Sequence, residues 1–87
     1  MEKAIYTKRQ KKLGALLRLA RRKALLSQAA LAEKLDKPQS FVSNYETGQR
    51  RLDVVELVAI AEVLGISASD VVAEVERRGM ATKMLAF

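Results

Sequence analysis

The stretch that decides the fold runs from Ser27 to Gly48 and has the sequence SQAALAEKLDKPQSFVSNYETG. Ser27 is a residue type that begins helices, and the residues after it predict a short helix over 28–35. Pro38 disfavours helix at the residue before it but suits the first position of a new helix, so a second helix is predicted over 38–47. Gly48 supplies its stop. The stretch therefore holds two short helices with a brief connection between them.

The second of these helices has an apolar and a polar face. Val42 and Tyr45 fall on the apolar face, and the polar face consists of Gln39, Ser40, Ser43 and Asn44. Amides and hydroxyls both donate and accept hydrogen bonds, and Gln or Asn can pair bidentately with adenine. Two short helices with such a face on the second are typical of a helix-turn-helix that enters the major groove of DNA. A polar surface helix without a ligand would have the same composition.

A further helix is predicted before this stretch. Thr7 and Gln10 have the spacing at which each side chain can satisfy the other's backbone amide, so the helix is expected to begin at Thr7. Its buried stripe follows three-and-four spacing and consists of Leu13, Leu16, Leu17, Ala20 and Ala24. Its first turns carry several cations, which oppose the helix dipole and so favour an anionic partner.

Two more helices are predicted after the stretch. Asp53 can cap the first of them, which ends at Gly65 and buries Leu57, Ile60, Ala61 and Leu64. Ser67 and Asp70 have capping-box spacing and open the second, which is expected to run to Arg78. The predicted fold class is all-α, with five helices in one domain.

The charge of the 87-residue chain is uneven. The net charge is +6, and residues 1–51 hold 13 of the 16 basic side chains and 4 of the 10 acidic ones. This part therefore carries +9, whereas residues 52–87 carry −3. A basic part beside an acidic part indicates a surface for a polyanion, although a solvated basic helix would give the same bias.

The composition excludes most other functions. The chain has no cysteine and no histidine, so the usual nucleophile, general base and metal ligands are missing, and no catalytic residue, metal or cofactor is predicted. No apolar stretch is long enough to span a membrane, and the first residues lead into no hydrophobic signal core, so a cytoplasmic, nucleoid-associated protein is expected. Binding to a membrane surface is disfavoured because the basic helix lacks large apolar anchors.

Residues 13–75 resemble the Cro/lambda-repressor-like (XRE-type) helix-turn-helix domain. The resemblance lies in four segments: LLRLAR at 16–21, SQAALAEKL at 27–35, QSFVSNYETG at 39–48 and LVAIAEVLGI at 57–66. It implies a five-helix lambda-repressor-like DNA-binding domain over 13–78. Residues 1–12 would then be a basic N-terminal arm with the start of the first helix, and 79–87 an apolar C-terminal tail.

The resemblance also implies roles for individual residues. Base edges would be contacted by Gln39, Ser40 and Asn44, with Ser43 reaching a base or a phosphate. Phosphates would be contacted by Ser27, Gln28, Lys37, Thr47, Gln49, Arg50 and Arg51. An ion pair between Arg21 and Glu46 would tie the first helix to the end of the third. The family usually has glycine where this chain has Leu25 and Asp36, and both sites end helices.

The predicted function is that of a sequence-specific transcriptional regulator, a repressor, on a palindromic double-stranded DNA operator. The alternative is an antitoxin or a restriction-modification controller that also binds a protein partner such as a toxin. Because one module contacts few base pairs, a homodimer is expected. The apolar residues that the sequence offers for its interface are Val71, Val72, Val75, Met80, Met84, Leu85 and Phe87.

Overall fold

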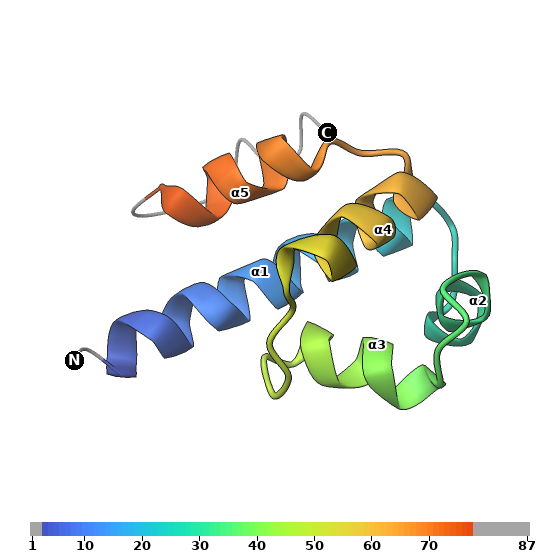
Figure 1. The fold of residues 1–87 in the computed structure, drawn as a ribbon, viewed down its shortest axis with the longest axis horizontal. Helices are drawn as coiled ribbons and strands as arrows, with labels where there is room; N and C mark the ends of the chain where they lie inside the picture. Colours follow the sequence, from blue (N-terminus) through green and yellow to red (C-terminus); the bar gives the residue numbers. More distant parts are fainter. Residues whose placement is uncertain (1–2, 78–87) are drawn as a thin grey trace.

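Five α-helices follow one another along residues 3–77, the part of the chain that this computed structural model describes (Figure 1). They are α1 Lys3–Lys23, α2 Gln28–Lys34, α3 Gln39–Glu46, α4 Val54–Leu64 and α5 Ala68–Glu76. No strand occurs within this range, so the predicted all-α class is confirmed. The short helix α3 packs against α2 and α1, and α5 packs against α1 and α4 (Figure 1).

The core takes an apolar stripe from each helix. Its members are Leu16, Leu17, Ala20, Leu31, Ala32, Phe41, Val42, Tyr45, Leu57, Ile60, Leu64 and Val71. Burying a large aliphatic or aromatic side chain contributes roughly 1.5–3 kcal/mol, so this cluster is the main source of stability. The predicted stripes are mostly found here, but Ala24 is exposed because it lies just after the last residue of α1.

The start of α1 differs from the prediction. The helix begins at Lys3 rather than at Thr7, because no proline or glycine interrupts the residues before Thr7 and the Thr-x-x-Gln spacing also occurs inside helices. Gln10 does not act as a cap residue. Its Nε2 donates to the backbone oxygen of Arg50, 2.9 Å away, so it joins α1 to the loop after α3.

The other helix starts follow the sequence closely. Ser27 caps α2 by accepting from the amide of Ala30 at 3.0 Å, and the Ser67 side chain caps α5. Asp53 and Glu56 form a reciprocal capping box at the start of α4. Pro38 is the N-cap of α3 rather than its first helical residue, since its backbone is extended, with ψ at 155°.

At two helix ends the backbone adopts a conformation that favours glycine, but neither residue is a glycine. Leu25 has φ of +61° and Asp36 has φ of +57°, at the sites where the resemblance leads to glycine. The left-handed conformation costs a non-glycine residue about 1 kcal/mol, and less for Asp, whose short polar side chain hydrogen-bonds locally. The two positions at which the chain departs from the glycine of the family therefore have a positive φ in the structure.

α1 and the end of α3 approach each other at Gly14. A Cβ atom at this position would lie 2.4 Å from the backbone oxygen of Tyr45 and 2.7 Å from that of Glu46. Only glycine allows this approach. The contact sets the position of α3, and therefore of its polar face, relative to the longest helix.

Candidate nucleic-acid interface

The two faces of α3 separate as the sequence predicts. Gln39, Ser40 and Asn44 are exposed and Ser43 is partly exposed, whereas the opposite face is buried and consists of Phe41, Val42, Tyr45 and Glu46. The Phe41 and Tyr45 rings meet edge to face, with centroids 5.4 Å apart. The structure therefore presents four side chains with donors and acceptors on one surface, above a fixed apolar base.

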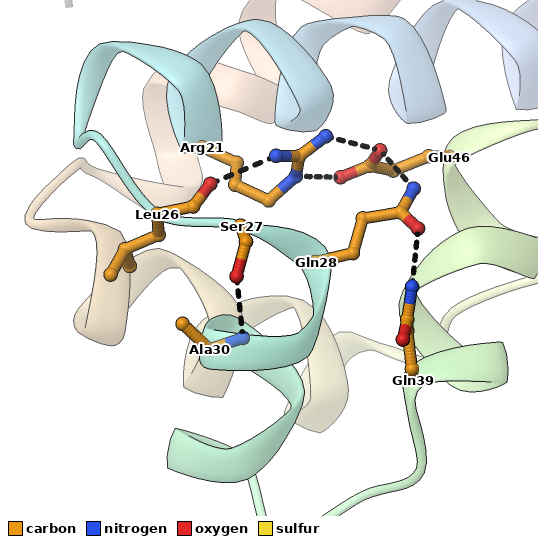
Figure 2. Close-up of polar contacts among 7 residues, drawn as sticks. All are labelled: Arg21, Leu26, Ser27, Gln28, Ala30, Gln39 and Glu46. Carbon is orange, nitrogen blue, oxygen red and sulfur yellow. Dashed lines mark hydrogen bonds and ion pairs between the residues drawn. The ribbon is translucent and has the colours of Figure 1, made fainter.

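A buried ion pair fixes the end of α3 to α1. The Arg21 Nε lies 2.7 Å from Glu46 Oε2, and Nη2 donates to Oε1 at 3.0 Å, so the predicted pair is present and bidentate (Figure 2). The remaining Arg21 Nη1 donates to the backbone oxygen of Leu26 at 2.8 Å. The hydrogen bonds that Arg21 donates to Glu46 raise the pKa of the Arg21 guanidinium above its ordinary value despite its burial. Removing either partner would leave a buried charge unpaired.

Gln28 extends this pair toward the exposed face of α3. Its Nε2 donates to Glu46 Oε1 at 3.0 Å, and its Oε1 accepts from Gln39 Nε2 at 3.3 Å (Figure 2). Ser27 and Gln28, expected to contact phosphate, thus use their side chains within the protein, Ser27 on the amide of Ala30. Gln39 is the end of a polar chain that begins at buried Arg21.

The loop after α3 contains four of the residues predicted to contact phosphates. Thr47, Gln49 and Arg51 are exposed, and Thr47 Oγ1 lies 3.2 Å from the backbone oxygen of Asn44. The Arg50 guanidinium is bidentate on Glu56, with Nη1 at 3.1 Å from Oε1 and Nη2 at 2.9 Å from Oε2. The loop is therefore anchored through a residue for which the resemblance implies a phosphate contact.

Arg50 and Lys37 both lie over the ring of Phe41. The Arg50 Cζ is 4.7 Å and the Lys37 Nζ is 5.4 Å from the ring centroid, distances typical of cation–π contacts. The hydrogen bonds from Arg50 hold the pKa of the Glu56 carboxyl below its usual value, with a second contribution from the amide of Asp53. The same carboxylate raises the pKa of Arg50.

The predicted dimer interface needs correction. Val71 is fully buried in the core and Val75 is partly buried against it, because α5 uses this side to pack on the rest of the domain. Val72 is 49% exposed. The other predicted interface residues, Met80, Met84, Leu85 and Phe87, lie outside the described residues. Val71 therefore cannot contribute to a contact between two copies.

Sequence reasoning missed three residues that shape this surface: Gly14, Phe41 and Glu56. The spacing of Asp53 and Glu56 matches the capping box and could have identified Glu56. Nothing in the sequence signals the pairing of Glu56 with Arg50 or the approach of α3 to Gly14. Residues 3–77 contain no group of His, Cys, Asp and Glu that could hold a metal ion, and no helix among them is long and apolar enough to cross a membrane.

Comparison with known proteins identifies the fold and the family. A helix-turn-helix family model matches residues 17–71. The control protein C.MunI from Mycoplasma sp. is 32% identical over 62 residues, which cover 71% of this chain and 84% of that protein. An XRE-family like protein from Pseudomonas syringae has a TM-score of 0.77 and 38% identity, and the match covers 85% of this chain and 90% of that one.

A restriction-modification controller protein has the same fold. The crystal structure of C.AhdI from Aeromonas hydrophila has a TM-score of 0.68 and 32% identity, and the match covers 71% of this chain and 94% of that one. The family model spans well over half of the chain and includes α2, α3 and α4. The chain therefore belongs to the helix-turn-helix family of XRE type, and it is a DNA-binding transcriptional regulator.

Proposed function

We propose that this regulator is a repressor whose α3 face selects the operator sequence and whose dimer covers promoter DNA. The observation that carries the proposal is the polar chain that ends at Gln39 on an exposed helix face. Phosphate contacts supply affinity without sequence information, and contacts to base edges supply selectivity. This role needs no catalytic group, and it places the protein in the cytoplasm with the nucleoid.

The polar chain determines which hydrogen-bonding groups Gln39 offers. Glu46 accepts only, so Gln28 turns its Nε2 toward it and its Oε1 toward Gln39. Gln39 must then use one N–H on Gln28, which leaves its carbonyl oxygen and its second N–H for a ligand. This acceptor and donor match N6 and N7 of adenine in the major groove. Gln39 is thus oriented before DNA arrives.

Substitution of the α3 face tests the proposal. Gln39→Ala and Asn44→Ala should each reduce affinity for the selected operator by about 1–3 kcal/mol and relax the preference at one base pair. Gln49→Ala is the matched control, because this exposed loop residue should affect all sequences alike. The proposal fails if both α3 variants keep the sequence preference of the wild-type protein.

The proposed repressor binds a palindromic operator as a homodimer. One module contacts few base pairs, and two modules reach half-sites one helical turn apart, about 34 Å. With Val71 in the core, the remaining candidates for the contact are exposed Val72 and the tail residues Met80, Met84, Leu85 and Phe87. Sedimentation equilibrium of the full chain should show a dimer at tens of micromolar or on operator DNA, and truncation after Arg78 should weaken it. A monomer under both conditions would contradict the homodimer.

A restriction-modification controller is the second candidate function. Its support is the similarity to C.MunI and C.AhdI, which are control proteins and match most of this chain. A restriction endonuclease gene next to this gene would favour it. Co-purification of a protein at a one-to-one ratio would instead favour the antitoxin alternative, in which a toxin is the partner.

A further inference from the structure

The guanidinium of Arg50 is occupied within the protein. It makes two hydrogen bonds to Glu56, its Nη1 donates to the backbone oxygen of Arg51 at 2.8 Å, and it lies over the Phe41 ring. These hydrogen bonds use both terminal nitrogens of the guanidinium, the fork that arginine frequently directs at two phosphate oxygens. To bind a phosphate bidentately through this fork, Arg50 would have to give up its hydrogen bonds to Glu56.

The partners of Arg50 belong to different helices, so its contacts join these helices to the loop. Phe41 belongs to α3 and Glu56 to α4, and the backbone oxygen of Arg50 accepts from Gln10 on α1. The amides of Gln49 and Arg50 donate to the backbone oxygen of Asn44 at 2.9 and 3.2 Å. The loop is therefore held at Arg50 by three helices while its neighbours remain exposed.

We propose that Arg50, Glu56 and Phe41 form a latch that positions the loop over 47–52 on the DNA backbone, and that Arg50 itself binds no phosphate. This inference rests on the proposed function, because it leaves the phosphate contacts of the loop to the exposed residues Gln49 and Arg51. It replaces the sequence-based role of Arg50 with that of a positioning residue. The acidic Glu56 is then needed for DNA binding although DNA is a polyanion.

Substitution of Glu56 distinguishes a positioning role of Arg50 from a phosphate-binding role, because the two roles predict opposite changes in DNA affinity. Glu56→Gln removes the charge that holds Arg50 but keeps the capping box, since Gln also serves at that position. A latch predicts affinity about two- to fivefold lower, the range expected for losing an exposed ion pair. A phosphate-binding Arg50 predicts higher affinity, because Arg50 is released and a negative charge is removed from the surface near DNA. Glu62→Gln, on the exposed side of α4, controls for the change in net charge.

The salt dependence of binding gives a second test at Arg50. Each phosphate contact contributes about 0.9 to the slope of log K against log salt. Arg50→Gln should lower affinity and leave this slope unchanged, whereas the neighbouring Arg51→Gln should reduce it by about 0.9. Arg50→Lys should also lower affinity, because lysine keeps the charge but lacks the bidentate fork. Circular dichroism at the assay temperature ensures that only folded protein is compared.

The experiment measures binding of the full-length variants to a selected duplex and to a random-sequence duplex of equal length. Lower affinity in Glu56→Gln, with an unchanged slope in Arg50→Gln, supports the latch. Higher affinity in Glu56→Gln, or a slope reduced by about 0.9 in Arg50→Gln, overturns it while leaving the proposed function intact. Failure of the wild-type protein to prefer the selected duplex would instead overturn the proposed function and the latch with it.

Discussion

The hydroxyl of Tyr45 is buried and has no hydrogen-bond partner within residues 3–77. Burial disfavours the phenolate and raises the pKa of this group above its ordinary value of about 10, and the nearby negative charge of Glu46 adds to the effect. Between pH 10 and the raised pKa, the unfolded chain releases this proton and the folded chain keeps it. The part of the free energy of unfolding that depends on keeping Tyr45 protonated is therefore fully present below pH 10. It is lost as the pH rises toward the raised pKa of the folded state.

Tyr45→Phe isolates this contribution. The free energy of unfolding of the wild-type protein should fall above pH 10 by up to about 1.4 kcal/mol per pH unit more than that of the variant. At neutral pH the variant should be as stable as the wild type or more so, because no hydrogen bond is lost. Denaturant titrations across this pH range provide the measurement. Parallel pH profiles for the two proteins would mean that the Tyr45 hydroxyl is not buried.

Leu25 and Asp36 allow a test of backbone strain at single positions. Leu25→Gly should raise the free energy of unfolding by about 0.5–1 kcal/mol, because glycine adopts its positive φ without steric cost. Asp36→Gly should raise the free energy of unfolding by less, since Asp tolerates a positive φ better than Leu does. Leu25 is 90% exposed, so little packing is lost with its side chain. Thermal or urea unfolding measures both, and a loss of stability at Leu25 would argue against the left-handed backbone there.

The close approach of α1 to α3 reverses the effect on stability that is usually expected when a glycine within a helix is replaced by alanine. Gly→Ala within a helix ordinarily stabilises it by about 1 kcal/mol. Gly14→Ala should instead destabilise the domain by about 1–3 kcal/mol, because the new methyl group would meet the backbone oxygens of Tyr45 and Glu46. Those oxygens belong to α3, so the helix that carries the base-contacting face must shift. DNA affinity should fall along with stability.

Gly65→Ala is the control for this substitution. Gly65 also has a positive φ, +71°, but a Cβ atom there would meet nothing within 4 Å. Its cost, about 1 kcal/mol, should come from the backbone conformation alone and should leave DNA affinity unchanged. Equal effects of the two variants on DNA binding would show that the contact at Gly14 does not position α3.

The helices themselves were largely predictable because their signals are local. Ser27, Asp53, Ser67 and Gly65 act on amides or carbonyls within a few residues, and the structure places helix ends at each. The Thr7 prediction was wrong because a capping-box spacing alone does not begin a helix when the preceding residues can also be helical. A capping signal therefore marks a helix start only where the residues before it do not themselves continue the helix.

The arrangement of the site was predictable only where a resemblance supplied it. Periodicity separated the exposed side chains of α3 from Val42 and Tyr45, and the resemblance supplied the pair of Arg21 with Glu46, which the structure contains. The pairing of Arg50 with Glu56 depends on the tertiary placement of α4 beside the loop. No spacing in the sequence encodes this placement, so the resemblance assigned Arg50 to phosphate without indicating its pairing with Glu56.

The basic charge of the molecule is concentrated in the part of the chain that contains the helix-turn-helix. The basic part of the chain, residues 1–51, contains α1, α2, α3 and most of the following loop, and the acidic part contains α4 and α5. A basic surface raises the rate of encounter with DNA and makes binding strongly dependent on salt. This property supplies affinity for any duplex, so it cannot by itself establish a sequence-specific regulator.

Selection of bound sites from random-sequence duplex DNA tests the central claim most directly, namely that the exposed face of α3 selects a sequence. The wild-type protein should enrich a motif of two inverted half-sites with centres about 34 Å apart. The Gln39→Ala protein should enrich the same motif with the preference lost at one base pair in each half-site. No enrichment by the wild-type protein, or identical motifs from both proteins, would contradict the account.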